Sequence, residues 1–165
     1  MKGLNHAVDA VDAVDALDSA NQLSEFMLAN IHYANELQRR CSADHGYCWK
    51  TPAETLNDGY GFCYDLSAFA LYCLKRQGYN ASRLLFTYWG QWGSESGTGH
   101  FVCVFREQGA FHAFDNGYLK GPYHSLRQII RVVAKGRPVQ GYQLLSWSQI
   151  PFHTPYRQLG YLASS

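Results

Sequence analysis

The sequence has few charged side chains and no long run of basic ones. Only 16% of its 165 residues are Asp, Glu, Lys or Arg, and the formal net charge is +1. Proteins that bind nucleic acid or an anionic membrane surface concentrate positive charge in the sequence. We therefore expect neither nucleic acid nor a membrane as a partner.

Paired cysteines and long apolar segments are also lacking. The five cysteines are odd in number and include no CxxC pair, which argues against a disulfide scaffold or a zinc knuckle. No stretch approaches the ~18 consecutive apolar residues of a membrane span. Near the N-terminus, aspartate recurs where a signal peptide would be apolar. We expect a soluble, reduced, cytoplasmic protein without cofactor or metal.

The length is that of one domain with its own core. The repeat AVDAVDAVDAL, over 7–17, has period three, so its apolar residues drift around a helix and form no stripe. The interpretation we favour is a flexible tail over 1–18, followed by a single domain over 19–165. A helix that binds a partner is the alternative for the repeat.

The pattern of apolar residues predicts helices first and strands afterwards. Helical spacing indicates helices over about 20–39, from 52 to near 58, over about 63–77 and over about 123–135. Strand patterns follow at 83–89, 100–105, 110–117 and 141–147, the first of these after the apolar 63–77 helix. This order is typical of an α+β fold whose sheet is mostly antiparallel, with 100–105 as a central strand.

Three residues have the types and settings of a thiol nucleophile and its base. Cys63 is predicted to begin a helix, where the positive end of the helix dipole favours thiolate. His100 opens a strand after a Gly- and Ser-rich loop, and Asp115 ends the next strand. A hairpin through 106–109 brings both to the same end, so Asp115 can orient the imidazole that activates Cys63. On spacing alone, a structural cysteine and an ordinary partnered histidine remain open, whereas Cys73 and Cys103 are expected to be core residues.

The stretch WKTPAETLNDGYGFCYDLSAFALYCLKRQGY resembles the bacterial transglutaminase-like cysteine proteinases, within the transglutaminase/papain-like superfamily. That family has a tryptophan, TP-x-E, a glycine-rich turn into GDCED, an apolar helix and a closing glycine. The matching positions are Trp49, Thr51, Pro52, Glu54, Gly59, Gly61, Cys63, Asp65 and Gly78. Further on, the histidine that opens a strand and the DN that ends the next one match His100 and Asp115-Asn116.

The resemblance implies a papain-like core with the nucleophile helix packed on the sheet, and a protein or peptide substrate. It implies Cys63 as nucleophile, His100 as general base and then acid, and Asp115 as the residue that orients the imidazole. Trp49 and the backbone N–H of Cys63 are candidates for an oxyanion site, with plain packing as the alternative for Trp49. Asn116 is a further candidate for substrate contact.

The sequence departs from the family beside the cysteine. GFCYD stands in place of GDCED, so Phe62 and Tyr64 occupy positions that are usually acidic. Calcium requires several oxygen ligands, and some relatives resemble calcium-dependent enzymes, so we predict no calcium requirement here. The loop over 88–100 contains Trp92 among glycines and serines and is interpreted as a mobile flap that contacts substrate, with a plain surface hairpin as the alternative.

These observations predict a cysteine peptidase or amidase that hydrolyses an amide bond through a thioacyl-enzyme. Two alternatives remain. The same acyl-enzyme can pass its acyl group to an amine, as a transglutaminase does. A non-catalytic module that kept the fold and binds a protein is the other.

Overall fold

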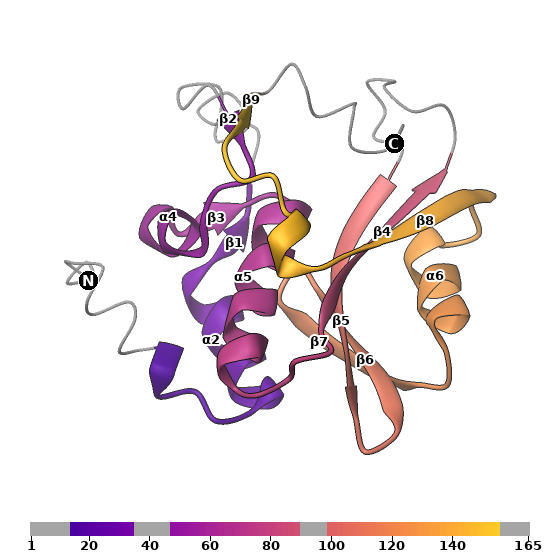
Figure 1. The fold of residues 1–165 in the computed structure, drawn as a ribbon, viewed down its shortest axis with the longest axis horizontal. Helices are drawn as coiled ribbons and strands as arrows, with labels where there is room; N and C mark the ends of the chain where they lie inside the picture. Colours follow the sequence, from indigo (N-terminus) through magenta and orange to yellow (C-terminus); the bar gives the residue numbers. More distant parts are fainter. Residues whose placement is uncertain (1–13, 35–46, 90–98, 156–165) are drawn as a thin grey trace.

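The computed structural model of the chain describes residues 14–34, 47–89 and 99–155, and in these a five-stranded antiparallel sheet lies between helices (Figure 1). The strand order is β7-β6-β5-β4-β8. The elements of this core are α2 (Ala20–Asn30), α4 (Pro52–Asp58), α5 (Cys63–Arg76), β4 (Arg83–Trp89), β5 (Gly99–Glu107), β6 (Ala110–Asp115), β7 (Tyr118–Tyr123), α6 (Leu126–Ala134) and β8 (Val139–Leu145). The predicted α+β class, with helices that precede a mostly antiparallel sheet, is confirmed.

Short elements complete the described part of the chain. Strands β1 (His32–Tyr33) and β3 (Tyr60–Gly61) pair in parallel, and β2 (Tyr47–Cys48) pairs antiparallel with β9 (Thr154–Pro155). A single turn of 3-10 helix, η2, spans Trp147–Gln149. Within the described residues, no helix has the length and apolar character needed to cross a membrane.

Both faces of the central strands are buried, which explains their nearly continuous apolar sequence. Alternate residues of β5 point to opposite faces. Phe101, Cys103 and Phe105 pack with α2 and α5, whereas Val102 and Val104 pack with Ile129 and Val133 of α6. Figure 1 shows this arrangement, with α2, α4 and α5 on one side of the sheet and α6 on the other.

Helix α5 is the central helix that the sequence predicts. Nine of its fourteen residues are buried, among them Cys73. Burial raises the pKa of the Cys73 thiol to about 12 and that of Cys103 still further, so the prediction that both are core residues is confirmed. After the helix, Gly78 takes a positive φ of 98°, which allows the N–H of Tyr79 to bond back to the carbonyl of Leu74.

The predicted helix over 20–39 ends at Asn30, so the prediction is wrong for residues 31–34. Ile31 has extended φ and ψ, and the chain then leaves the helix to pair with β3. The N–H groups of His32 and Ala34 bond to the carbonyls of Gly59 and Gly61, which are distant in sequence. Residues 35–39 lie outside the described residues.

Two further boundaries differ from the predictions. The strand over 110–117 ends at Asp115, because Asn116 and Gly117 have φ of 50° and 92° and turn the chain into β7. Strand β7 was not predicted, and it occupies the start of the predicted 123–135 helix. That helix begins only at Leu126, where Ser125 accepts a hydrogen bond from the N–H of Gln128 at 3.2 Å.

Residues 14–18 contact the domain. Val14 is 5% exposed and belongs to the core, and Asp15 forms an ion pair with Arg76 of α5. Residues 1–13, with most of the period-three repeat, lie outside the described residues, and the flexible tail over 1–18 stays a prediction.

Two buried serines link helices to the sheet. Ser67 of α5 places its hydroxyl 2.6 Å from the carbonyl of Cys63 and 3.1 Å from that of Phe101 in β5. Ser24 of α2 donates to the carbonyl of Gly117 at 2.7 Å and accepts from the N–H of Leu119 at 3.2 Å. Each hydroxyl therefore joins a helix to a strand that is distant in sequence.

Ser67→Ala and Ser24→Ala are each expected to lower the free energy of unfolding by about 1–2 kcal/mol, because a buried carbonyl loses its donor. Urea unfolding followed by tryptophan fluorescence measures this. Only Ser67 lies on the helix that begins with Cys63, so only Ser67→Ala is expected to slow alkylation of that thiol. Equal slowing in both variants would contradict a local role for Ser67.

Candidate functional site

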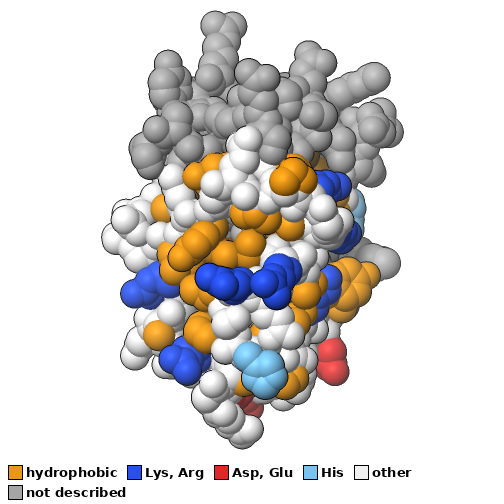
Figure 2. Space-filling view, turned by 90° about the vertical axis from the view of Figure 1, so that its right-hand side faces the viewer, with side chains coloured by type: hydrophobic (Ala, Val, Ile, Leu, Met, Phe, Trp, Pro, Cys, Tyr) orange, Lys and Arg blue, Asp and Glu red, His pale blue; other side chains and the backbone are white. Residues whose placement is uncertain are grey.

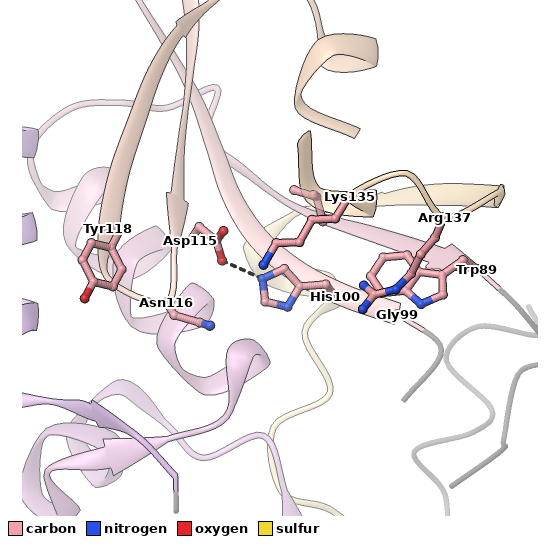
Figure 3. Close-up of a pocket in the computed structure, with 9 residues that line it drawn as sticks. Trp89, Gly99, His100, Asp115, Asn116, Tyr118, Lys135 and Arg137 are labelled. Atoms are coloured by element: carbon pink, nitrogen blue, oxygen red, sulfur yellow. Dashed lines mark hydrogen bonds and ion pairs between the residues drawn. The ribbon is translucent and has the colours of Figure 1, made fainter. Parts of the chain in front are cut away.

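His100 and Asp115 meet at one end of the β5–β6 hairpin. Cys103 pairs with Phe114, so His100 and Asp115 fall near the same end, on the sheet face that carries Val102. The Nε2 of His100 lies 2.6 Å from Oδ1 of Asp115 (Figure 3). The prediction that a hairpin brings His100 and Asp115 to the same end is therefore confirmed.

Asp115 is held between two cationic partners. Its second carboxylate oxygen accepts a hydrogen bond from Nζ of Lys120 in β7 at 2.9 Å. Burial alone would raise the pKa of Asp115, but the hydrogen bonds from His100 and Lys120 lower it to about 2. Asp115 therefore stays ionised at neutral pH and keeps its orientation toward the imidazole. The sequence offered no signal for Lys120, because β7 was not predicted.

The same imidazole also interacts with Cys63. Asp115 pairs with Nε2 of this imidazole, and Cys63 is the other side chain that raises its pKa. Burial would lower the pKa of His100, but the hydrogen bonds to Asp115 and Cys63 outweigh it and raise this pKa to about 9. Imidazolium next to sulfur is the arrangement that stabilises a thiolate. The structure thus brings together the three residues that the sequence singled out.

Helix α5 places Cys63 as its first residue, half-buried, after the extended Phe62. The first N–H groups of a helix have no partner within the helix, so they can face a developing oxyanion. Ser67, one turn on, links the carbonyl of Cys63 to β5. Sequence reasoning missed Ser67; its only signal was a serine four residues after the cysteine in an apolar helix.

Asp65 fixes the chain on both sides of the cysteine. Its Oδ1 accepts from the N–H of Lys50 at 2.8 Å and its Oδ2 from the N–H of Phe62 at 3.0 Å. The side chain is 1% exposed, and burial raises its pKa to about 6 although the two backbone N–H groups oppose this shift. Asp65 thereby ties the segment that contains Trp49 to the first turn of α5.

Trp49 forms the wall behind the cysteine. Its ring lies 5.1 Å from Tyr64 and 4.9 Å from Phe101, so it contacts residues adjacent to both Cys63 and His100. Trp49 is 0% exposed, and its Nε1–H has no hydrogen-bond partner in the described part of the chain. It also has a φ of 59°, a strained value for a large side chain. Its oxyanion role stays a prediction.

The two residues that flank Cys63 in the sequence are aromatic and contact each other. Phe62 and Tyr64 stack at 5.6 Å, and Tyr33 meets Phe62 edge-on at 6.1 Å. Both flanking residues are only partly buried. Trp92 and residues 90–98 of the predicted flap lie outside the described residues.

A pocket of about 240 Å³ opens beside His100 (Figure 3). It is lined by Trp89, Gly99, His100, Asp115, Asn116, Tyr118, Val133, Lys135 and Arg137. The side-chain oxygen of Asn116 is buried and has no hydrogen-bond partner among the described atoms. The sequence singled out Asn116 but gave no signal for Lys135 and Arg137, because only the fold brings the end of α6 to this hairpin.

The residues around Cys63 do not fit a calcium ion. Phe62 and Tyr64 offer no carboxylate, and the remaining acidic side chain, Asp65, is buried with both oxygens bonded to backbone N–H groups. Calcium takes six to eight oxygen ligands. In the described ranges, no three His, Cys, Asp or Glu side chains come together in a metal-binding arrangement.

No family model and no curated protein matches this chain. Among solved structures it is similar to LapG of Legionella pneumophila. The calcium-bound structure is 18% identical with a TM-score of 0.44, and the match covers 66% of this chain and 62% of that one. An EGTA-treated structure is 15% identical with a TM-score of 0.48, and the match covers 93% of this chain and 82% of that one. A third structure is 14% identical with a TM-score of 0.49, and the match covers 93% of this chain and 80% of that one. At these values the likeness assigns no function.

The ion pair at His100 makes stability depend on pH. Folding raises the pKa of His100 from 6.5 to about 9, so its contribution is complete below pH 6.5 and is lost as the pH rises through 9. Folding lowers the pKa of Asp115 from 3.8 to about 2, so that contribution is complete above pH 3.8 and is lost toward pH 2. The pair is most stabilising between about pH 4 and 6.5.

We expect the stability advantage of wild type over Asp115→Asn to shrink between pH 6.5 and 9.5, by on the order of 2 kcal/mol. Urea unfolding at several pH values measures it. Asp15→Asn, which removes the exposed partner of Arg76, is the matched control and should keep a constant difference over this range. A constant difference for Asp115→Asn as well would contradict the assigned pairing.

Calcium is expected to leave the melting temperature unchanged, because no open set of carboxylates remains beside Cys63. Differential scanning fluorimetry with millimolar calcium and with EGTA checks this. A rise in melting temperature with calcium that EGTA reverses would contradict the prediction.

Proposed function

We propose that the chain is a cysteine peptidase or amidase that hydrolyses an amide bond in a protein or peptide through a thioacyl-enzyme. The observation that carries the proposal is the position of His100, which bonds to Cys63 and to Asp115 at once. The sequence resemblance to the transglutaminase-like cysteine proteinases supports the same assignment of Cys63 as nucleophile.

In the first half-reaction the Cys63 thiolate attacks the amide carbon, and the carbonyl π electrons move to oxygen. The N–H groups at the start of α5 face that oxyanion. When the tetrahedral intermediate collapses, the C–N bond breaks and protonated His100 gives its proton to the leaving nitrogen. The products are a thioester on Cys63 and a free amine.

In the second half-reaction neutral His100 takes a proton from water, and the resulting hydroxide attacks the thioester carbon. The C–S bond then breaks, which releases a carboxylic acid and restores the thiolate beside imidazolium. Asp115 keeps the ring orientation through both halves, because Lys120 fixes its other oxygen at 2.9 Å. Asp115 stabilises each imidazolium by charge and takes no proton itself.

Selective alkylation tests the nucleophile. At pH 6, iodoacetamide is expected to modify Cys63 at least about ten-fold faster than the other four cysteines, and His100→Ala should remove this preference. Peptide mass spectrometry after timed quenching gives the rate at each thiol. Uniform alkylation of all accessible thiols would overturn the proposal.

The reaction itself is tested by incubating peptide libraries with wild type or with Cys63→Ala. New N-termini that appear only with wild type support hydrolysis. New isopeptide crosslinks in place of new N-termini would assign a transglutaminase. Retention of a peptide by both proteins without turnover would assign a binding module.

A further inference from the structure

The pocket beside His100 has a cationic rim that the reaction steps above do not use. Lys135 and Arg137 line it, both exposed, and Figure 3 shows the Lys135 side chain extending toward His100. Within the described ranges, neither side chain forms an ion pair with an acidic residue. The acidic residue in the lining, Asp115, is already engaged by His100 and Lys120.

A strained turn places these two cations. Lys135 caps α6 in the left-handed conformation with φ of 51°, and Gly136 follows with φ of 83°. A left-handed conformation costs about 1–2 kcal/mol for a residue with a side chain. The turn reverses the chain directly after the helix and brings residues 135 and 137 to the same pocket. Strain of this kind is concentrated at functional sites in proteins.

Arg137 is also oriented by its neighbour. Its guanidinium lies 4.7 Å from the ring centre of Trp89, and both side chains line the pocket. Stacking on an aromatic ring restrains the long side chain while its N–H donors remain available. A carboxylate can then bind with a smaller loss of side-chain freedom.

The surrounding surface adds to the positive potential. From Leu126 to Arg137 the sequence has four basic residues and no acidic one. Figure 2 shows the face that includes α6 and β8, with Lys and Arg side chains across its centre and acidic ones only at its margin. An anion that approaches this face meets attraction before it reaches the pocket.

Resting on the proposed function, we propose that Lys135 and Arg137 form a subsite for a carboxylate side chain of the substrate, on the leaving-amine side of the scissile bond. The lining includes His100, which protonates the leaving nitrogen, and does not include Cys63, which holds the acyl group. An aspartate or glutamate immediately after the cleaved bond reaches the two cations from this side.

A pair of probes that differ by one charge tests the subsite. N-iodoacetyl-aspartate amide and N-iodoacetyl-asparagine amide have the same shape, and both alkylate thiols. We expect the aspartate probe to modify Cys63 about five-fold faster in wild type, because two exposed cations contribute about that much at contact distance. The ratio of the aspartate-probe rate to the asparagine-probe rate should fall to about one in K135Q/R137Q. In wild type this ratio should decrease with added salt.

R131Q is the matched control, since Arg131 is an exposed basic residue of the same helix outside the pocket lining. It should keep the wild-type ratio of the aspartate-probe rate to the asparagine-probe rate, whereas the double variant should lose it. An equal preference in wild type and K135Q/R137Q would overturn the subsite alone. If neither probe selected Cys63 over the other thiols, the proposed function would fall and the subsite with it.

Discussion

The packing of the first turn of α5 on β5 is the constraint on which the whole site depends. Cys63 comes from the helix and His100 from the strand, so their distance is set by how the two elements fit. Ser67 fixes that fit at the carbonyls of Cys63 and Phe101. A slip of one helical turn would move the thiol by about 5.4 Å, beyond hydrogen-bond reach of the imidazole.

The charges at the site form a chain that alternates in sign. Lys120 and His100 share the carboxylate of Asp115, and His100 in turn bonds to Cys63. Since the carboxylate is partly buried, removing both cations would leave its charge without compensation, which costs more free energy than the ion pairs contribute. The same chain keeps Asp115 from binding Lys135 or Arg137, and among the described residues neither cation forms an ion pair with another acidic side chain.

The sequence was most informative where local chemistry decides the structure. The helix that begins at Cys63 and strand β4 are where the pattern placed them, and the β5–β6 turn brings His100 to Asp115 as its offsets predict. The prediction failed where a distant partner decides. Residues after Asn30 continue a helical pattern, yet the backbone of His32 pairs with Gly59. The roles of Ser67, Lys135 and Arg137 exist only through tertiary contacts, which periodicity does not encode.

The aromatic residues beside Cys63 hold the turn before α5 without a cluster of charges. A cluster of carboxylates at this point would repel itself and would need a cation to bring it together. Here Phe62 stacks on Tyr64, Trp49 packs behind them, and Asp65 closes the turn by accepting two backbone N–H groups. The first turn of α5, which begins with the thiol, is thus held by ring contacts and one buried carboxylate.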